Sequence, residues 1–111
     1  MPTSLPTDFN NNPIPALRFK TGGSHTINVT QNSVQNTVPF DDETKVISLY
    51  STGPVYIKFG TDGVEATDQD HYFPGFTYYD VAIGEKSTGH FTHLAVIRAE
   101  QDCTLYISEK E

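Results

Sequence analysis

The chain has 111 residues, with 7 Lys and Arg against 14 Asp and Glu, and therefore a formal net charge of -7 at pH 7. This length is enough for one hydrophobic core and too short for a second. The negative charge disfavours nucleic acid and membrane surfaces as partners, because phosphate groups would repel the protein.

Hydrophobic residues make up 36% of the chain, and they include seven Phe and six Tyr but no Trp. A small apolar share that is rich in aromatic rings favours a thin two-layer β core over a helical bundle. The single cysteine, Cys103, cannot form an internal disulfide, so packing or assembly must stabilise the fold. The chain has neither the apolar run of a membrane span nor a secretory signal, and we expect a soluble protein synthesised in the cytoplasm.

Proline and asparagine are concentrated in residues 1–13, and this composition predicts an extended N-terminal arm ahead of a domain over residues 14–111. One interpretation of the arm is a frayed terminus. The other is a segment that orders against a neighbouring subunit, with Leu5, Phe9 and Ile14 as anchors.

The first half of the domain alternates short strand-like runs with turns. Residues 14–20 resemble a strand, Thr21-Gly22-Gly23-Ser24 predicts a turn, and residues 24–30 alternate polar and apolar side chains as a half-buried strand does. Residues 31–35 are polar and predict a loop.

Two strong strands follow, over residues 45–51 and 54–59, and the Gly53-Pro54 connection predicts that they form a hairpin. In residues 55–60 bulky side chains occupy both sides of the alternation, which suits a strand with one face in the core and the other against a partner or second layer. Residues 61–70 are polar, and with 71–75 they predict a long excursion across the end of the sandwich.

The last part of the chain predicts strands over residues 76–83, 91–99 and 103–108, with a polar turn over 84–89. Seven or eight short strands and no amphipathic helix predict one all-β domain, an antiparallel β-sandwich or jelly roll. The apolar residues expected to supply most of its core are Ile47, Leu49, Val55, Ile57, Phe59, Leu94, Val96, Leu105 and Ile107.

Two groups of residues are of the types that bind metals. Of the four histidines, His90 and His93 are three apart, a spacing that places them on opposite faces of a strand, so exposed or hydrogen-bonded histidines are favoured over zinc ligands. The stretch Asp62–Asp70 contains four carboxylates, which suits calcium, but it lacks the spacing of an EF-hand loop. A solvated acidic loop is favoured there, and calcium remains an alternative.

No catalytic pattern accompanies the strands. The chain has no Gly-x-Ser-x-Gly elbow, Cys103 begins a core-like strand, and Gly22-Gly23 precedes a strand and not the helix that a phosphate site needs. The acidic residues lie in turns and loops, without the paired carboxylates across a cleft that glycoside hydrolysis requires. We therefore expect no enzyme and no cofactor.

Five segments of the second half of the chain form a recognisable pattern: Val55–Gly60, Ala66–Asp70, Tyr72–Gly75, Leu94–Ile97 and Cys103–Glu109. Through these segments the stretch from Lys45 to Glu111 resembles small proteins encoded among the head genes of tailed bacteriophages. The resemblance implies a virion structural protein on the capsid surface, a decoration or auxiliary protein that binds and stabilises the assembled head, with no catalytic residues. Its partners would be the major capsid protein or other virion proteins.

We expect a homo-oligomer, a dimer or trimer, because an isolated sandwich of this size is only marginally stable. The residues expected to form the contact surface are Leu5, Phe9, Tyr72, Phe73 and Phe76. An aromatic cluster beside Pro74-Gly75 suits a neighbour's pocket, and the alternative is that these rings cap the sandwich core.

Two other functions remain open at this point. A head-tail joining or tail component would have the same composition. A carbohydrate-binding module would use exposed Tyr and Phe rings to stack on sugars, although the absence of Trp weakens that alternative.

Overall fold

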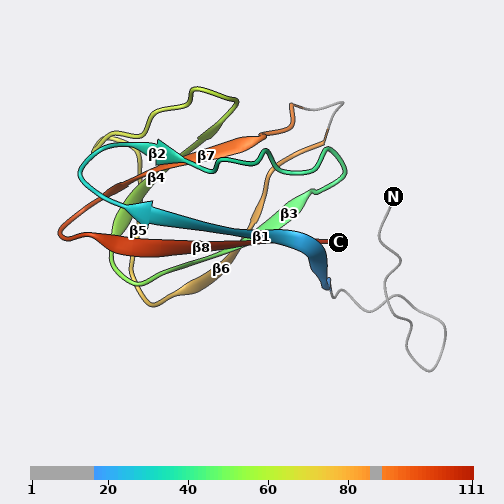
Figure 1. Cartoon of the computed structure of the whole chain (residues 1–111), viewed down its shortest axis with the longest axis horizontal. Coiled ribbons are helices and arrows are strands. Elements are labelled where there is room, and N and C mark those ends of the chain that lie inside the picture. The colour runs from blue at the N-terminus through green and yellow to red at the C-terminus, as the bar shows by residue number, and fades with distance from the viewer. Residues whose placement is uncertain (1–16, 86–88) are drawn as a thin grey trace.

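The computed structural model describes residues 17–85 and 89–111, and all the regular elements within these ranges are β-strands (Figure 1). Eight strands form two four-stranded antiparallel sheets in a sandwich-like arrangement, which confirms the predicted all-β fold. The strands are β1 Phe19–Val29, β2 Val34–Gln35, β3 Val46–Ser51, β4 Val55–Gly60, β5 His71–Phe73, β6 Tyr78–Ala82, β7 His93–Arg98 and β8 Cys103–Lys110.

Both sheets combine strands from the two halves of the chain. The first sheet has the order β1-β8-β3-β6, and the second sheet has the order β2-β7-β4-β5. Strand β1 thus pairs with β8, β2 with β7, β3 with β6 and β4 with β5, so the chain folds back on itself around the β4–β5 loop. The contacts that hold each sheet together therefore join residues far apart in sequence. The hairpin predicted from the Gly53-Pro54 connection is wrong, because β3 and β4 lie in different sheets and the short connection links one sheet to the other.

The core lies between the two sheets, where alternate residues of each strand face inward. Eight of the nine residues predicted for the core are buried, and Phe59 is partly buried against them. The core also contains five residues that the prediction did not include, Ile27, Val29, Phe40, Phe73 and Ile83.

The turn predicted over residues 21–24 is wrong, because these residues lie inside β1. The register of β1 against β8 shifts between Phe19 and Ser24, as in a β-bulge, and Gly22 adopts a φ of 77° there. A bulge and a turn both need positive φ, which glycine supplies without steric cost, so the sequence signal is the same for both. Glycine is required at position 23 for a different reason, because an added Cβ would lie only 2.8 Å from Cβ of Glu109.

Three further boundaries differ from the prediction. The polar stretch 31–35 contains β2, and the excursion predicted to include 71–75 contains β5. The last strand before the polar turn is shorter than predicted, since Phe76 has a φ of 60° and β6 begins only at Tyr78. The prediction missed β2, which is two residues long, because its stretch of sequence is polar. It missed β5, which is three residues long, because a Pro-Gly pair follows it.

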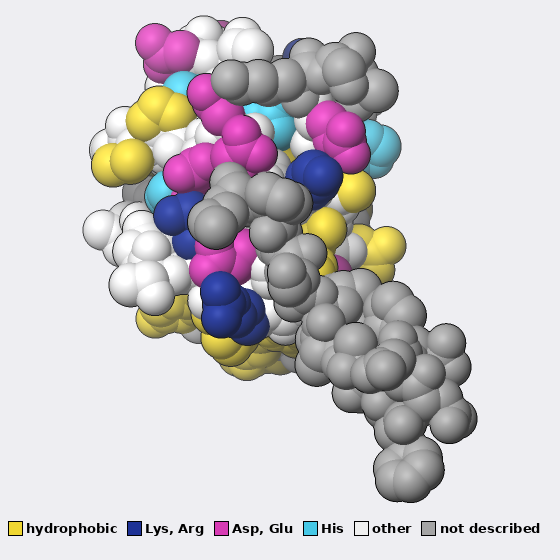
Figure 2. Space-filling model, turned by 90° about the vertical axis from the view of Figure 1, so that its right-hand side faces the viewer, with side chains coloured by type: hydrophobic (Ala, Val, Ile, Leu, Met, Phe, Trp, Pro, Cys, Tyr) yellow, Lys and Arg dark blue, Asp and Glu magenta, His cyan; other side chains and the backbone are white. Residues whose placement is uncertain are grey.

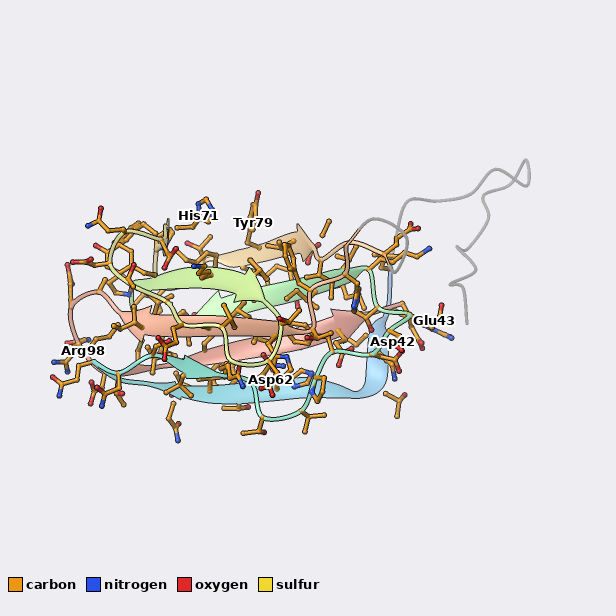
Figure 3. All side chains as sticks on the ribbon, turned by 90° about the horizontal axis from the view of Figure 1, so that it is seen from above. Asp42, Glu43, Asp62, His71, Tyr79 and Arg98 are labelled. Atoms are coloured by element: carbon orange, nitrogen blue, oxygen red, sulfur yellow. The ribbon has the colours of Figure 1, made fainter. Side chains whose placement is uncertain are left out.

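The stretch 61–70 crosses the second sheet and not the end of the sandwich. The side chain of Gln35 in β2 donates to Asp62 at 2.7 Å and accepts from Gly63 N at 3.0 Å, and Ala66 N donates to Ser33 Oγ at 2.8 Å. Because β2 is the edge strand farthest from β5, the loop extends from β4 to β2 and back. Asp62 is labelled beside β2 in Figure 3.

Candidate contact surface

The residues predicted to form a contact surface have different surroundings. Leu5 and Phe9 lie outside the described residues. Phe73 pairs with Val55 across β5 and β4 and faces inward, so its ring is part of the core and is not available to a partner. Tyr72 and Phe76 are exposed, with 57% and 73% of their surface accessible.

Phe76 has an unusual backbone for a bulky residue. Its φ of 60° is positive, a conformation that costs an L-residue roughly 1–2 kcal/mol. Its N–H donates to Ser51 O at 2.7 Å, and the preceding Gly75 lies so close to Gly53 that an added Cβ would be 2.8 Å from that backbone. The turn therefore holds an aromatic ring in solvent at a conformational cost, and such strain is typical of functional positions.

Three tyrosines form a row across the outer face of the first sheet, and we call Tyr78, Tyr50 and Tyr106 the tyrosine row. Tyr50 pairs with Tyr78 on β6 and with Tyr106 on β8, so the three side chains are neighbours on adjacent strands. Tyr78 and Tyr106 are 53% and 48% exposed. The sequence shows each tyrosine but not the register that aligns them, and the prediction missed this surface.

A lysine and an aspartate lie beside the tyrosine row. The Nζ of Lys110 is 2.8 Å from Oδ1 of Asp80 and lies over the rings of Tyr78 and Phe19, at 5.1 and 5.6 Å from their centroids. Burial opposes the charge of Lys110, but the hydrogen bonds and attraction from Asp80 and Tyr78 outweigh it and raise its pKa. The positive charge on this face is thus balanced by Asp80, and the face presents mainly aromatic and hydroxyl groups.

The four histidines are exposed or hydrogen-bonded. Nε2 of His25 lies 2.8 Å from Oε2 of Glu109, Nε2 of His90 lies 2.7 Å from Thr44 O, and Nδ1 of His93 lies 2.8 Å from the hydroxyl of its neighbour Thr92. His71 is exposed on the edge strand β5, on the same side of the sandwich as Tyr79 (Figure 3). Within 17–85 and 89–111, no group of three or more His, Cys, Asp and Glu side chains could hold a metal ion.

The carboxylates of the stretch 61–70 organise the loop. Asp70 accepts from the N–H and hydroxyl of Thr67 at 2.7 and 3.2 Å, and Asp62 accepts from Gln35. Asp68 accepts from the neighbouring Gln69 at 3.3 Å. These contacts fix the loop across the second sheet.

The loop forms one wall of a groove on the outer face of the second sheet. The groove has a volume of about 560 Å³. Its lining residues are Gln31, Tyr56, Ala66, Thr67, Asp68, Ile97, Arg98, Ala99 and Glu100. Tyr72 lies beside the lining residue Tyr56, and the two rings meet edge to face with their centroids 5.7 Å apart.

The opposite end of the molecule is charged. Figure 2 shows acidic and basic side chains gathered there. Lys20, Asp41, Glu43, Thr44 and Glu111 line a smaller hollow of about 210 Å³ at this end. Asp41 Oδ1 accepts the N–H of Glu43 at 2.8 Å, and this bond, helped by the attraction of Lys20, outweighs slight burial and lowers the pKa of Asp41. Figure 3 shows Asp42 and Glu43 at this end and Arg98 at the other.

Comparison of the chain with protein-family models, with curated proteins and with solved structures found no match in any of the three. In the part of the chain that the structure describes, no helix is long and apolar enough to cross a membrane.

Proposed function

We propose that the protein is a virion structural protein of a tailed bacteriophage, an auxiliary or decoration protein that binds and stabilises the assembled head. The resemblance of residues 45–111 to small phage head proteins supports this proposal. The exposed aromatic surfaces support it as well, because they suit a protein that acts by contact and not by catalysis.

The strand order supports the same proposal. Pairing of β1 with β8, β2 with β7, β3 with β6 and β4 with β5, divided between two sheets, is the arrangement we propose to be a jelly roll. Jelly rolls recur in viral capsid proteins and in lectins. A similar fold does not by itself imply the same function, so the main support for the proposal has to come from the contact surface.

The exposure and the strained backbone of Phe76 are the main observations in support of the proposal. The residue is 73% exposed although its backbone is strained and fixed by a hydrogen bond to Ser51 O. An exposed ring adds little to the stability of the isolated domain, whereas a ring buried in a partner's pocket is typical of the few residues that dominate binding. We therefore assign Phe76 as the anchor, with the tyrosine row as the adjoining surface.

The partner that we propose for this surface is the major capsid protein. Tyrosine and phenylalanine are enriched at protein interfaces, whereas the net charge of -7 opposes nucleic acid. Binding the assembled shell better than free subunits would stabilise the shell by mass action over many copies. The protein itself is proposed to form a dimer or trimer, with Leu5 and Phe9 of the arm contacting a neighbouring copy.

Electron cryomicroscopy of the source particle tests the proposal. Many copies on the shell, with Phe76 against the capsid protein, would support decoration. A ring of copies at one vertex would instead support a head-tail joining protein, and absence from virions would contradict both.

A binding assay tests the assigned surface separately. Purified protein is sedimented with capsids that lack it, and Phe76→Ala and Tyr78→Ala are expected to reduce the bound fraction. Val38→Ala is the matched control, since Val38 is also exposed but lies in neither the tyrosine row nor the Phe76 turn. Equal binding by Phe76→Ala and the control would remove Phe76 from the interface.

A further inference from the structure

We propose that the groove on the outer face of the second sheet binds a neutral oligosaccharide. This site lies on the sheet opposite the tyrosine row, so the inference goes beyond the proposed capsid contact and does not depend on it. The groove's volume of about 560 Å³ falls within the range of ligand pockets in proteins, roughly 300–1,000 Å³.

The groove is lined by Tyr56 and Ile97 and flanked by Tyr72, and these side chains have the chemistry that stacks on sugar rings. Tyr72, Tyr56 and Ile97 are paired across β5, β4 and β7, so they form a row that spans two strand spacings, roughly 9–10 Å. The rings of Tyr72 and Tyr56 meet edge to face, and Tyr72 is 57% exposed. An aromatic and aliphatic strip of this length can contact the apolar faces of two linked sugar rings.

The rim has the chemistry that binds hydroxyl groups. Gln31, Thr67, Asp68, Arg98 and Glu100 line the groove with amide, hydroxyl, carboxylate and guanidinium groups, which together both donate and accept hydrogen bonds. Glu100 is exposed, and within the described part of the chain its carboxylate has no hydrogen-bond or ion-pair partner. A polyhydroxylated ligand can satisfy such a mixed set of groups.

The groove is fixed before any ligand arrives. Its wall is tied to β2 by the bond from Ala66 N to Ser33 Oγ at 2.8 Å, and Ala66 itself is buried. At its end Arg98 is held by Asp102 at 2.6 Å and lies 3.4 Å from the side-chain oxygen of Gln31. A preformed site avoids the entropy cost of ordering a loop on binding.

The charges favour a neutral sugar over other occupants. Two carboxylates, Asp68 and Glu100, stand at the rim, and the charge of Arg98 is already balanced by Asp102, so phosphates and acidic sugars are repelled. A peptide that adds as a strand needs a free sheet edge, whereas this groove lies over the face of the sheet. A basic peptide is the competing occupant, and the test must separate it from a sugar.

The test is a titration of the full-length, ¹⁵N-labelled protein with maltotriose, cellotriose and triacetylchitotriose at millimolar concentrations. At least one sugar is expected to shift the backbone amides of Tyr56, Thr67 and Ile97. Tyr56→Ala is expected to weaken that sugar's binding about tenfold, the effect of losing about 1.4 kcal/mol.

Glu100→Ala provides a second variant, because Glu100 is exposed and its loss does not threaten the fold. It is expected to weaken the same sugar severalfold. Tyr106→Ala is the matched control, since it removes a tyrosine from the outer face of the other sheet and should leave binding unchanged.

Three results would overturn the inference. The first is an absence of shifts with all three sugars, and the second is equal weakening by Tyr106→Ala and Tyr56→Ala. The third is that an oligolysine peptide shifts the groove amides while the sugars do not, which would assign the groove to a basic peptide.

Discussion

Nε2 of His25 lies 2.8 Å from Oε2 of Glu109, and the two side chains are only 8% and 5% exposed. The other carboxylate oxygen of Glu109 accepts from Asp41 N at 2.8 Å and from the hydroxyl of Thr44 at 2.7 Å. One buried carboxylate thus joins β1, β8 and the 41–44 turn. Because the side chains of His25 and Glu109 are almost inaccessible to solvent, this network stabilises the fold and is not positioned to contact a ligand.

Glu109→Ala is therefore expected to lower the free energy of unfolding by about 2–4 kcal/mol, since it leaves the ring of His25, the N–H of Asp41 and the buried hydroxyl of Thr44 without their partner. Urea denaturation followed by tyrosine fluorescence measures the change. Glu65→Ala, at an exposed position, serves as the control and should stay within about 0.5 kcal/mol of the parent. A similar small loss for Glu109→Ala would show that the network contributes little.

Gly23 and Gly22 are adjacent but are expected to resist substitution for different reasons. An added Cβ at Gly23 would lie 2.8 Å from Cβ of Glu109 and 3.2 Å from Lys20 O, so Gly23→Ala should cost about 1–3 kcal/mol through overpacking. Gly22→Ala meets no atom within 4 Å and should cost about 1 kcal/mol, through its φ of 77° alone.

Asparagine tolerates positive φ better than alanine, and this separates the two mechanisms. Gly22→Asn should recover part of the loss, whereas Gly23→Asn should be at least as destabilising as Gly23→Ala. Thermal unfolding of the four variants measures both effects. Recovery at Gly23 would mean that crowding by Glu109 is not the cause.

The strands and most of the core were predictable because both depend on local patterns. The alternation of apolar residues places Ile47 and Leu49 in the core without knowledge of the partner strands. The tyrosine row depends on the register of β3 with β6 and β8, and the His25–Glu109 contact joins residues 84 positions apart. Neither leaves a signal in a short window of sequence.

The adjacent glycines Gly22 and Gly23 show another limit of structure prediction from local sequence. Thr21-Gly22-Gly23-Ser24 suits a turn between strands as well as a bulge within one, since both require the same backbone freedom. Only the pairing of Phe19 with Lys110 and of Ser24 with Ser108, on one partner strand, decides between them.

The acid stability of the protein should depend on Asp41. Its pKa is lowered in the folded state, so its contribution to stability is fully present above the unfolded value of 3.8 and is lost as the pH falls through the folded value below it. Asp41→Asn keeps an oxygen that can accept the N–H of Glu43 but has no charge. The stability difference between parent and variant should be constant from pH 7 to about 5 and shrink below pH 3.8, as measured by denaturation at each pH. A difference that stays constant down to pH 2 would contradict this assignment.

Deleting residues 1–12 should leave the sandwich folded and weaken self-association. The described core and the strands of both sheets begin at Phe19, so the deletion removes no strand and no described core residue. We expect an unchanged melting temperature of the monomeric unit and a smaller mass by light scattering at equal concentration. If the truncated chain assembles as well as the full chain, the arm is not part of the interface.

Two substitutions at Phe76 should separate its ring from its strained backbone. Phe76→Gly removes a backbone strain of roughly 1–2 kcal/mol. The greater conformational freedom of glycine in the unfolded chain costs only roughly 0.5–1 kcal/mol. The folded variant should therefore be more stable than the parent by about 0.5–1 kcal/mol. Phe76→Ala keeps a Cβ at a φ of 60° and should not gain stability. Both variants lack the ring and should lose capsid binding equally. Urea denaturation and sedimentation with capsids measure the two effects, and a stability loss in Phe76→Gly would show that the ring itself stabilises the isolated domain.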